Sequence, residues 1–445
     1  MLISGDELST CTGDNQARRI ITSNRSNHFI RTALVLFMGL IMLFEEGDAA
    51  DANKEESKVP AYTLPDPLIN NAGQPVTTPD QWTNGRRAEL FQIFSDQVYG
   101  KSLAPPKATK SMVHERDAIG GIAVRKEVRL EFTGETGQCM MDLTVYRPKN
   151  VTGPVPVFVG IHVFDKNHDL PLPGARILKE GKPLPEGIDP KLLPGADTVK
   201  RILERGYAVA TIEPDGISAD DANTYLKGAL TIDWPADKKA RTPNDPGALS
   251  AWAWAISRAV DYFATDKDFD ATKVIAIGHS RRGKAALWAG ANDPRLAAVI
   301  SNESGCGGAA LSKRIFGETV AHINDRFPHW FCENFRQYNK NEDKLPVDQH
   351  ELIALIAPRP VYIGSAEKDL WADPTGEFLS ALNADPVYRL LGTKGFGGVK
   401  EFPPVNQSVG ETIGYHVRSG EHNLSDLDWM LYLDWADKVI PKTVK

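Results

Sequence analysis

The stretch VIAIGHSRRGKAALWAG, residues 274–290, decides the fold of this chain. Four apolar residues typical of a buried strand lead into a glycine-rich corner, and a run with helical character follows the corner. The corner fits two motifs with one fault in each. As G-x-S-x-x-G it has one residue more than the G-x-S-x-G nucleophile elbow of serine hydrolases. As G-x-x-x-x-G-K-A it lacks the hydroxyl residue that ends a phosphate-binding P-loop.

The P-loop interpretation fails because position 285 is Ala, where a P-loop needs the hydroxyl of Ser or Thr to bind Mg²⁺. A P-loop also normally follows an early strand, whereas several predicted strands precede this corner. A nucleophile elbow needs small residues around its serine, and Gly278 and Gly283 provide them. We therefore interpret the corner as a tight turn that exposes the hydroxyl of Ser280.

On both sides of the corner, short apolar runs predict strands that are buried on both faces. These runs cover residues 155–163, 207–212, 273–277, 296–301 and 360–364, with helical segments at 247–265 and 283–291. Nearer the N-terminus, the sequence predicts a helix at 81–99 and antiparallel strands at 123–132 and 140–146. The pattern predicts an α/β fold, a three-layer αβα sandwich with helices on both faces of a mostly parallel central sheet.

The composition is that of an ordinary globular protein and not of one that binds nucleic acid. The 445 residues are 42% apolar and 24% charged, and the formal net charge is −7. No basic run, and no interleaving of basic with aromatic residues, offsets that charge locally. We therefore expect no nucleic-acid partner.

An apolar run near the N-terminus is typical of a signal peptide. Residues 33–44 are apolar, follow four arginines between positions 18 and 31, and precede small residues at 49, 50 and 52. A helix of this length spans about 18 Å, less than the ~30 Å hydrocarbon core of a membrane. We predict a signal peptide with a long n-region at 1–52, a linker or N-terminal extension at 53–75, and a single catalytic domain at 76–445. The mature protein is then exported and has no stable membrane span, although a buried helix and a start downstream of Met1 remain alternatives.

Two further features concern a loop and the thiols. The Pro- and Gly-rich residues 170–197 predict a loop insertion between strands.

Cys306 and Cys332 are the better spaced pair for a disulfide, which export would permit. Packed, reduced thiols explain these cysteines equally well.

An elbow serine requires an acid and a histidine later in the chain. Glu303 follows the predicted strand 296–301, Asp369 follows the predicted strand 360–364, and His422 precedes the last predicted helix. Taken singly, each residue has a common structural explanation, such as a helix cap or a surface histidine. Together, at the ends of successive strands, they predict a catalytic triad with Ser280. The histidines show no metal-ligand spacing, so we expect neither a metal nor a cofactor.

Further motifs give the chain a resemblance to the glucuronoyl esterases, carbohydrate esterase family 15 of the α/β-hydrolase fold. The similarity extends from about residue 75 to the end. It rests on GHSRRGK (278–284), SNESGCGG (301–308), FGET (316–319), FPHWF (327–331), LPVDQH (345–350), APRPV (357–361) and WADP (371–374). The resemblance implies a serine esterase that cleaves the ester between a (4-O-methyl-)glucuronic acid branch of glucuronoxylan and an alcohol of lignin.

The resemblance also implies a role for individual residues. Ser280 is the expected nucleophile, His422 its general base and Glu303 the acid that orients the histidine. Arg281 is expected to bind the oxyanion, and a single donor of this kind is typically worth about 3 kcal/mol. The positions that contact the uronic acid correspond to Lys284, Glu318 and Trp371. Simpler explanations remain for two of these, a solvated first-turn lysine and a core tryptophan.

Departures from the fungal members of the family leave alternatives open. Fungal members join two cysteines beside the site as a disulfide, whereas this chain has His279 and Asn423 there and so resembles the bacterial branch. Some bacterial members use the later acid, which keeps Asp369 as an alternative to Glu303. An acetyl xylan esterase or general carbohydrate esterase remains an alternative activity, and a non-catalytic carbohydrate-binding relative an alternative class.

Overall fold

The computed structural model describes residues 52–163, 196–234 and 240–441 of the chain. From Ala52 onward the chain forms one compact unit. The predicted signal peptide, apart from its last position, lies outside the described residues, as does most of the predicted loop insertion at 170–197. Within the described part of the chain, no helix is both long and apolar enough to cross a membrane.

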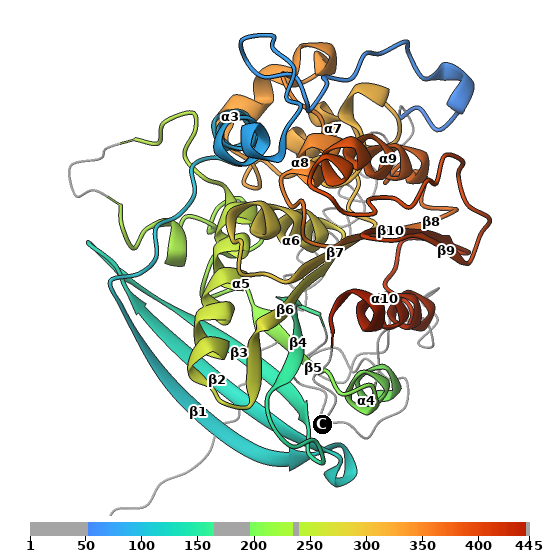
Figure 1. The fold of residues 1–445 in the computed structure, drawn as a ribbon. Coiled ribbons are helices and arrows are strands. Elements are labelled where there is room, and N and C mark those ends of the chain that lie inside the picture. The colour runs from blue at the N-terminus through green and yellow to red at the C-terminus, as the bar shows by residue number, and fades with distance from the viewer. Residues whose placement is uncertain (1–51, 164–195, 235–239, 442–445) are drawn as a thin grey trace, which may run out of the picture. The chain divides into compact units, whose positions relative to one another are not determined.

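Ten strands of the described residues form one sheet. They are β1 (Ala108–Ala118), β2 (Ala123–Thr133), β3 (Gln138–Pro148), β4 (Val155–Ile161), β5 (Ala208–Glu213), β6 (Phe269–His279), β7 (Ala298–Asn302), β8 (Val361–Ala366), β9 (Gln407–Gly410) and β10 (Ile413–Arg418). Their order is β1-β2-β3-β5-β4-β6-β7-β8-β10-β9. The strands from β5 to β10 in this order run parallel, whereas β1, β2 and β3 pair antiparallel at one end and β9 does so at the other. Figure 1 shows β1, β2 and β3 as long, curved strands at the lower left.

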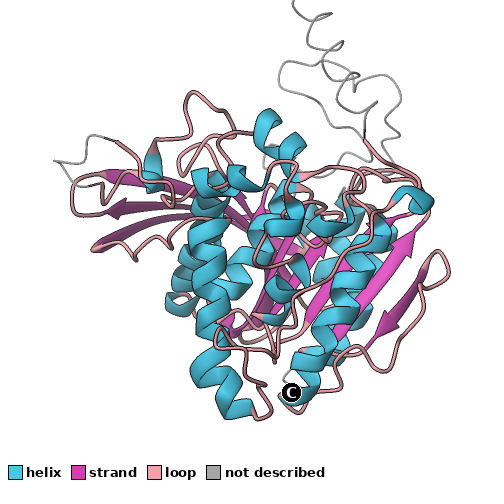
Figure 2. Cartoon of the chain, turned by 90° about the horizontal axis from the view of Figure 1, so that it is seen from above, coloured by secondary structure: helices cyan, strands magenta, loops and turns pink. Residues whose placement is uncertain are grey.

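Helices cover both faces of this sheet. They are α2 (Pro79–Gln81), α3 (Arg87–Gln97), α4 (Ala196–Glu204), α5 (Ala248–Thr265), α6 (Arg281–Asn292), α7 (Val320–Arg326), α8 (Gln349–Ala354), α9 (Pro374–Leu390) and α10 (Asp426–Val439). Residues of α3, α5, α6, α8 and α9 contribute to one apolar core, and residues of α4 and α10 contribute to a second core. Figures 1 and 2 show these helices flanking the strands, which confirms the predicted three-layer αβα sandwich.

The predicted strands and helices are present, with small shifts at their ends. The helix predicted at 81–99 consists of α2, a π-helical segment at Trp82–Arg86 and α3. Strands β1, β9 and β10 were missed. β9 is only four residues long and largely exposed. β1 is exposed along nearly its whole length and so shows no apolar alternation, while His416 and Arg418 interrupt the apolar character of the buried β10.

The residues predicted as a linker or extension, 53–75, contact the rest of the compact unit. The N–H of Gly317 donates to the carbonyl of Asn53 at 2.8 Å, and Arg314 pairs with Glu56 at 2.8 Å. Further along, the extension is held by His350, whose Nε2 donates to a carbonyl of residue 65 at 2.8 Å. The extension therefore lies against the loop that precedes α7.

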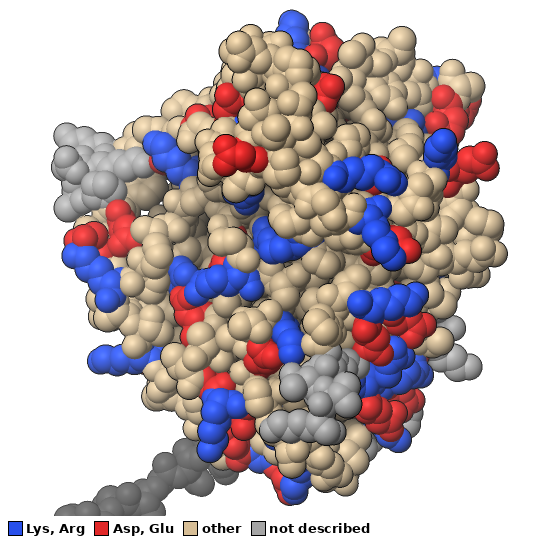
Figure 3. Space-filling model, viewed as in Figure 1, with Lys and Arg blue, Asp and Glu red and all other residues tan. Residues whose placement is uncertain are grey.

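The described residues show the state of three thiols and, on one face, the distribution of surface charge. Cys139, Cys306 and Cys332 are buried and free, so the disulfide considered between Cys306 and Cys332 does not form. On the face shown in Figure 3, Lys and Arg side chains are interspersed with Asp and Glu. The charges on that face are mixed and form no extended basic area.

Candidate active site

Ser280 lies at a tight turn between β6 and α6. It is the N-cap of α6, with φ 59° and ψ −131°, and its N–H donates to the carbonyl of Asn302 at 2.8 Å. A positive φ outside glycine costs on the order of 1–3 kcal/mol, so surrounding contacts must hold the serine. Two glycines near the serine allow the chain to approach this closely, because they have no Cβ. A Cβ on Gly278 would lie 2.1 Å from the carbonyl oxygen of Arg282, and one on Gly283 would lie 2.9 Å from a side-chain oxygen of β7. The extra residue of G-x-S-x-x-G is accommodated in the first turn of α6.

A cavity of about 270 Å³ lies beside Ser280. Every residue predicted for the site lines it: Ser280, Arg281, Lys284, Glu303, Glu318, Asp369, Trp371 and His422. These side chains come from the β6–α6 corner, from the carboxyl ends of β7 and β8, and from the loops before α7 and α10. Phe327 and Trp330 add aromatic surface to the same wall. The structure thus brings together all the residues that the sequence selected.

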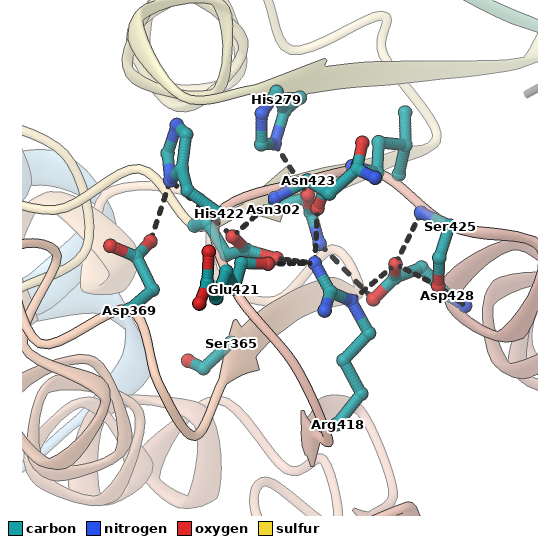
Figure 4. Close-up of polar contacts among 12 residues, drawn as sticks. His279, Asn302, Ser365, Asp369, Arg418, Glu421, His422, Asn423, Ser425 and Asp428 are labelled. Atoms are coloured by element: carbon teal, nitrogen blue, oxygen red, sulfur yellow. Dashed lines mark hydrogen bonds and ion pairs between the residues drawn. The ribbon is translucent and has the colours of Figure 1, made fainter. Parts of the chain in front are cut away.

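His422 faces two carboxylates. Its Nδ1 lies 2.6 Å from Oδ2 of Asp369 and 3.3 Å from Oε2 of Glu303. Figure 4 shows the imidazole directed at Asp369, with which it forms a short, charge-assisted hydrogen bond. Both acids considered for the triad therefore reach the same ring nitrogen, and the shorter contact belongs to Asp369.

These charges set the basicity of the histidine. Burial would lower the pKa of His422, but hydrogen bonds and charge from Asp369 and Glu303 outweigh burial and raise that pKa to about 10. Burial would raise the pKa of Asp369, yet the hydrogen bond and charge of His422 hold it below its ordinary value. Burial raises the pKa of Glu303 to about 8, against the opposing effects of His422 and Arg418. Asp369 is therefore the more strongly ionised partner of the histidine.

Arg418, the last residue of β10, holds the loop that carries His422. Its guanidinium donates to Oε1 of Glu303 at 2.6 Å, to Oδ2 of Asp428 at 2.9 Å and to two carbonyl groups of the loop at 2.8 and 2.7 Å. The N–H of Asn423 donates to the other oxygen of Glu303 at 2.9 Å. Figure 4 shows the guanidinium of Arg418 between Asp428 and the loop that carries Glu421 and Asn423. The loop is thereby fixed to the ends of β7, β10 and α10.

His279 lies directly before Ser280, at the end of β6. Its ring centroid lies 4.5 Å from that of His422, and its Nδ1 lies 2.7 Å from Oδ1 of Asn302. Burial lowers the pKa of His279 to about 3, so this ring stays neutral near neutral pH. Asn302 is in turn held by the hydroxyl of Tyr432 at 2.8 Å. His279, held in this way, packs against the ring of His422 and supports it from one side.

The residues matched to uronic acid contacts lie together along the cavity. Lys284 is only 3% exposed, and its Nζ donates to the carbonyl of Ser304 at 2.5 Å and lies 3.6 Å from Oε2 of Glu318. It is therefore not a solvated lysine. Trp371 is partly exposed and lies against the ring of His322, with centroids 5.4 Å apart, so it is not a core residue. The group offers hydrogen-bond donors, a carboxylate acceptor and an aromatic face to a ligand.

Arg281 follows Ser280 as the first residue of α6. Its Nη1 donates to Oδ2 of Asp220 at 2.7 Å, and its guanidinium carbon lies 4.5 Å and 4.8 Å from the ring centroids of Trp330 and Phe327. The first N–H groups of a helix have no intrahelical carbonyl partner and carry partial positive charge. Both the backbone and the side chain of Arg281 are therefore suited to an oxyanion formed beside Ser280.

Several supporting residues were missed by the sequence analysis: Asp220, Asn302, Trp330, Arg418 and Asp428. Arg418 and Asp428 could have been found from the sequence. They stand on either side of His422 and lie within apolar segments, where a buried charge requires an opposite charge as its partner. Trp330 lies inside the FPHWF motif and had been noted only as part of it. Asp220 lies in a loop without a motif, so no signal in the sequence indicated it.

One group of residues could in principle hold a metal ion. Within the described ranges, Glu303, Asp369 and His422 bring ligand atoms within 4.8 Å of one another. Two ligands of one tetrahedral Zn²⁺ lie roughly 3.3 Å apart when each is about 2.0 Å from the metal. The 2.6 Å between Nδ1 of His422 and Oδ2 of Asp369 instead suits a shared proton. The group as arranged is a hydrogen-bonded acid–base pair with a second carboxylate.

Comparison with known proteins finds closely similar relatives. Residues 196–392 match the family model described as glucuronyl esterase, fungi. The chain is 44% identical over 399 residues to carbohydrate esterase MZ0003 from an unknown prokaryotic organism, covering 86% of this chain and 91% of the relative. A solved promiscuous esterase of carbohydrate esterase family 15, from a marine bacterial metagenome, is 44% identical with a TM-score of 0.75, covering 87% of this chain and 100% of that one. A solved glucuronoyl esterase from Solibacter usitatus is 42% identical with a TM-score of 0.78, covering 86% and 100%.

Proposed function

Because this chain belongs to the glucuronoyl esterases of carbohydrate esterase family 15, we propose that it hydrolyses esters of (4-O-methyl-)D-glucuronic acid through an acyl-enzyme on Ser280. The observation that carries the proposal is the single cavity that Ser280 and His422 share with Arg281, Lys284 and Glu318. The expected natural substrate is the ester between the uronic acid branches of glucuronoxylan and lignin alcohols.

The reaction begins with attack of the Ser280 hydroxyl on the ester carbonyl. Nε2 of His422 takes the serine proton as the bond forms, and the resulting imidazolium is stabilised by the carboxylates beside Nδ1. Collapse of the tetrahedral intermediate breaks the bond to the alcohol, which leaves with the proton of His422. A water molecule then attacks the acyl group, again with His422 as base, and glucuronic acid is released.

Asp369 and Glu303 support His422 in different ways. Asp369, which makes the shorter hydrogen bond and has the lowered pKa, fixes the imidazole tautomer and carries most of the negative charge. Glu303, preferred from the sequence as the acid, holds the histidine loop through Arg418 and adds a second carboxylate at 3.3 Å. Neither residue then acts alone, and the loss of one leaves the other in reach of the imidazole.

Charge that develops on the carbonyl oxygen is stabilised by Arg281. A charged donor held in place before the reaction needs no rearrangement in the transition state, and the loss of one such donor typically costs about 3–4 kcal/mol. The ion pair with Asp220 and the two aromatic rings support this role, because they fix the guanidinium beside the cavity.

The sugar half of the ester is recognised by Lys284, Glu318 and Trp371. A buried lysine and carboxylate are poorly served by an acetyl group, which has no hydroxyls to pair with them. This argues for a uronic acid over acetyl xylan as the acyl donor. It also argues against a purely non-catalytic role, since the same cavity contains an elbow serine and a hydrogen-bonded histidine.

The substrate assignment is tested by comparing kcat/KM for benzyl D-glucuronate, benzyl D-galacturonate and acetylated xylan. We expect the glucuronate to be preferred over its C4 epimer by roughly 10–200-fold, and acetylated xylan to be the poorest substrate. Glu318→Gln should raise KM for the glucuronate, whereas the exposed Glu333→Gln is the matched control. Equal rates on acetyl and glucuronoyl esters would contradict the assignment.

We also infer that residues 1–52 direct export and are removed, which leaves the extension at 53–75 and one catalytic domain from 76 onward. The apolar run and the small residues after it support this inference. N-terminal sequencing of the protein from a Gram-negative host should find a mature end near residues 50–53. Recovery of the intact N-terminus from the cytoplasm would contradict it.

A further inference from the structure

We propose that Asp220 is a positioning residue, whose ion pair holds the guanidinium of Arg281 at the cavity wall and so sets the stabilisation that this arginine gives to the transition state. The proposal rests on the oxyanion role of Arg281 proposed above. It concerns a residue that no motif selects and that lies in the loop after β5, far in sequence from the nucleophile.

The carboxylate of Asp220 is held from three directions. Its Oδ2 accepts from Nη1 of Arg281 at 2.7 Å. Its Oδ1 accepts from Nε2 of His329 at 3.0 Å and from the indole N–H of Trp330 at 2.8 Å. His329 is 4% exposed and Trp330 is 2% exposed, so two of the three donors are themselves fixed in the protein interior. The acid is thus a rigid anchor and not a mobile surface charge.

The same anchor also holds the surface on which the arginine lies. The guanidinium carbon of Arg281 is 4.5 Å from the ring centroid of Trp330, and Trp330 donates to the carboxylate that binds Arg281. Acid, indole and guanidinium therefore form a closed set of three contacts. A free arginine side chain loses rotamer entropy when it is ordered, and an arginine already fixed in the free enzyme loses little more of it in the transition state.

Asp220 acts through Arg281 and not directly on a substrate. Arg281, Phe327 and Trp330 line the cavity, whereas Asp220 is not among the described residues that line it. Burial would raise the pKa of Asp220, but His329 and the charge of Arg281 hold it well below its ordinary value, so the carboxylate is ionised near neutral pH. The anion weakens the positive potential at the oxyanion site but fixes the geometry of the donor. The proposal is that geometry outweighs this loss of potential.

A double-mutant cycle tests the proposal. Asp220→Asn keeps the size of the side chain and an oxygen acceptor for the indole, but removes the ion pair with Arg281. On benzyl glucuronate we expect the kcat of this variant to fall about 10–100-fold, with KM changed less than about threefold. The guanidinium is then no longer held in place, and its hydrogen bond to the substrate oxygen matters mainly in the transition state. In an Arg281→Ala background, the same substitution should cause no further loss. Asp221→Asn is the matched control, since this neighbouring acid is exposed and contacts only its own turn.

Arg281→Lys provides a second variant that leaves Asp220 and its loop intact. Lysine retains the charge but cannot form the planar fork, so its kcat should fall nearly as far as that of Arg281→Ala. A thermal melt of each variant reports whether it is folded.

Each contrary outcome has a distinct meaning. Equal losses from Asp220→Asn in both backgrounds would show a merely structural role and overturn the proposal. A rise in kcat would show that the carboxylate acts as an inhibitory counter-charge, which also overturns it. If Arg281→Ala lowers kcat but Asp220→Asn does not, only this inference fails. If Arg281→Ala itself has no effect, the oxyanion role proposed for Arg281 fails as well.

Discussion

Replacement of Asp369 by asparagine should lower the pKa of His422 and move the acid limb of the pH–rate profile to lower pH. His422 must be neutral to accept the proton of Ser280, so kcat/KM rises with pH through the pKa of this histidine in the free enzyme. The carboxylate beside Nδ1 favours the protonated form. Loss of its charge therefore moves the limb downward, while the maximum rate falls because the imidazole is held less firmly.

The size of the change follows from the contacts of His422. The ordinary pKa of an imidazole is about 6.5, and Asp369 and Glu303 together raise that of His422 to about 10. One opposite charge at this range typically moves a pKa by about 1–3 units. Because Asp369 lies at 2.6 Å and Glu303 at 3.3 Å, Asp369→Asn should move the limb further than Glu303→Gln. Each single variant should retain about 1–10% of the maximum rate, whereas the double variant should lose about 10⁴-fold, as when a triad acid is removed outright.

The assay is the pH dependence of kcat/KM on benzyl glucuronate for wild type, both single variants and the double variant. Glu367→Gln is the matched control, because this exposed carboxylate lies two residues from Asp369. A thermal melt at each pH excludes unfolding. The reasoning is refuted if the limb of Asp369→Asn coincides with that of wild type while Glu303→Gln moves it.

Three further changes have expected outcomes. Gly278→Ala should destabilise the fold by at least about 1–3 kcal/mol in urea unfolding, because its Cβ would lie 2.1 Å from a carbonyl oxygen, whereas Gly85→Ala, with no atom within 4 Å, should be nearly neutral. Arg418→Met should cost about 3–5 kcal/mol by the same measurement, since it leaves Glu303 and Asp428 buried without the guanidinium that pairs with both. A cost below about 1 kcal/mol would contradict the view that Arg418 holds the loop of His422 in place. Trp371→Ala should raise KM for benzyl glucuronate at least about fivefold and leave KM for a simple acetate ester nearly unchanged. An equal rise of KM for both esters would mean that Trp371 stabilises the fold and does not bind the sugar.

The sequence was sufficient to predict the sheet centre and to select residues that the structure brings together around one cavity. Strands buried on both faces appear as continuous apolar runs, and the catalytic side chains of such a fold stand at the ends of those strands. Glu303 and Asp369 were recognisable because each follows one of these runs. Strand β1 was not recognisable, since a strand exposed on both faces has no pattern of burial to report.

The relative importance of Glu303 and Asp369 could not be derived from the sequence. The same holds for the contacts that fix the site residues in place. The distances of Glu303 and Asp369 from His422 depend on the loop of His422, which Arg418 ties to β7 and α10 through contacts distant in the chain. The role suggested for Asp220 depends in the same way on side chains from three separate loops and helices. Such contacts carry no periodicity, so a sequence can name the residues without showing which pairs meet.

The central claim, that Ser280 forms the acyl-enzyme, is tested most directly by single-turnover release of benzyl alcohol from benzyl glucuronate with Ser280→Ala in excess over substrate. We predict a rate lower than that of wild type by at least about 10⁴-fold, with an unchanged thermal melt. Release by the variant at more than about one hundredth of the wild-type rate would contradict the account.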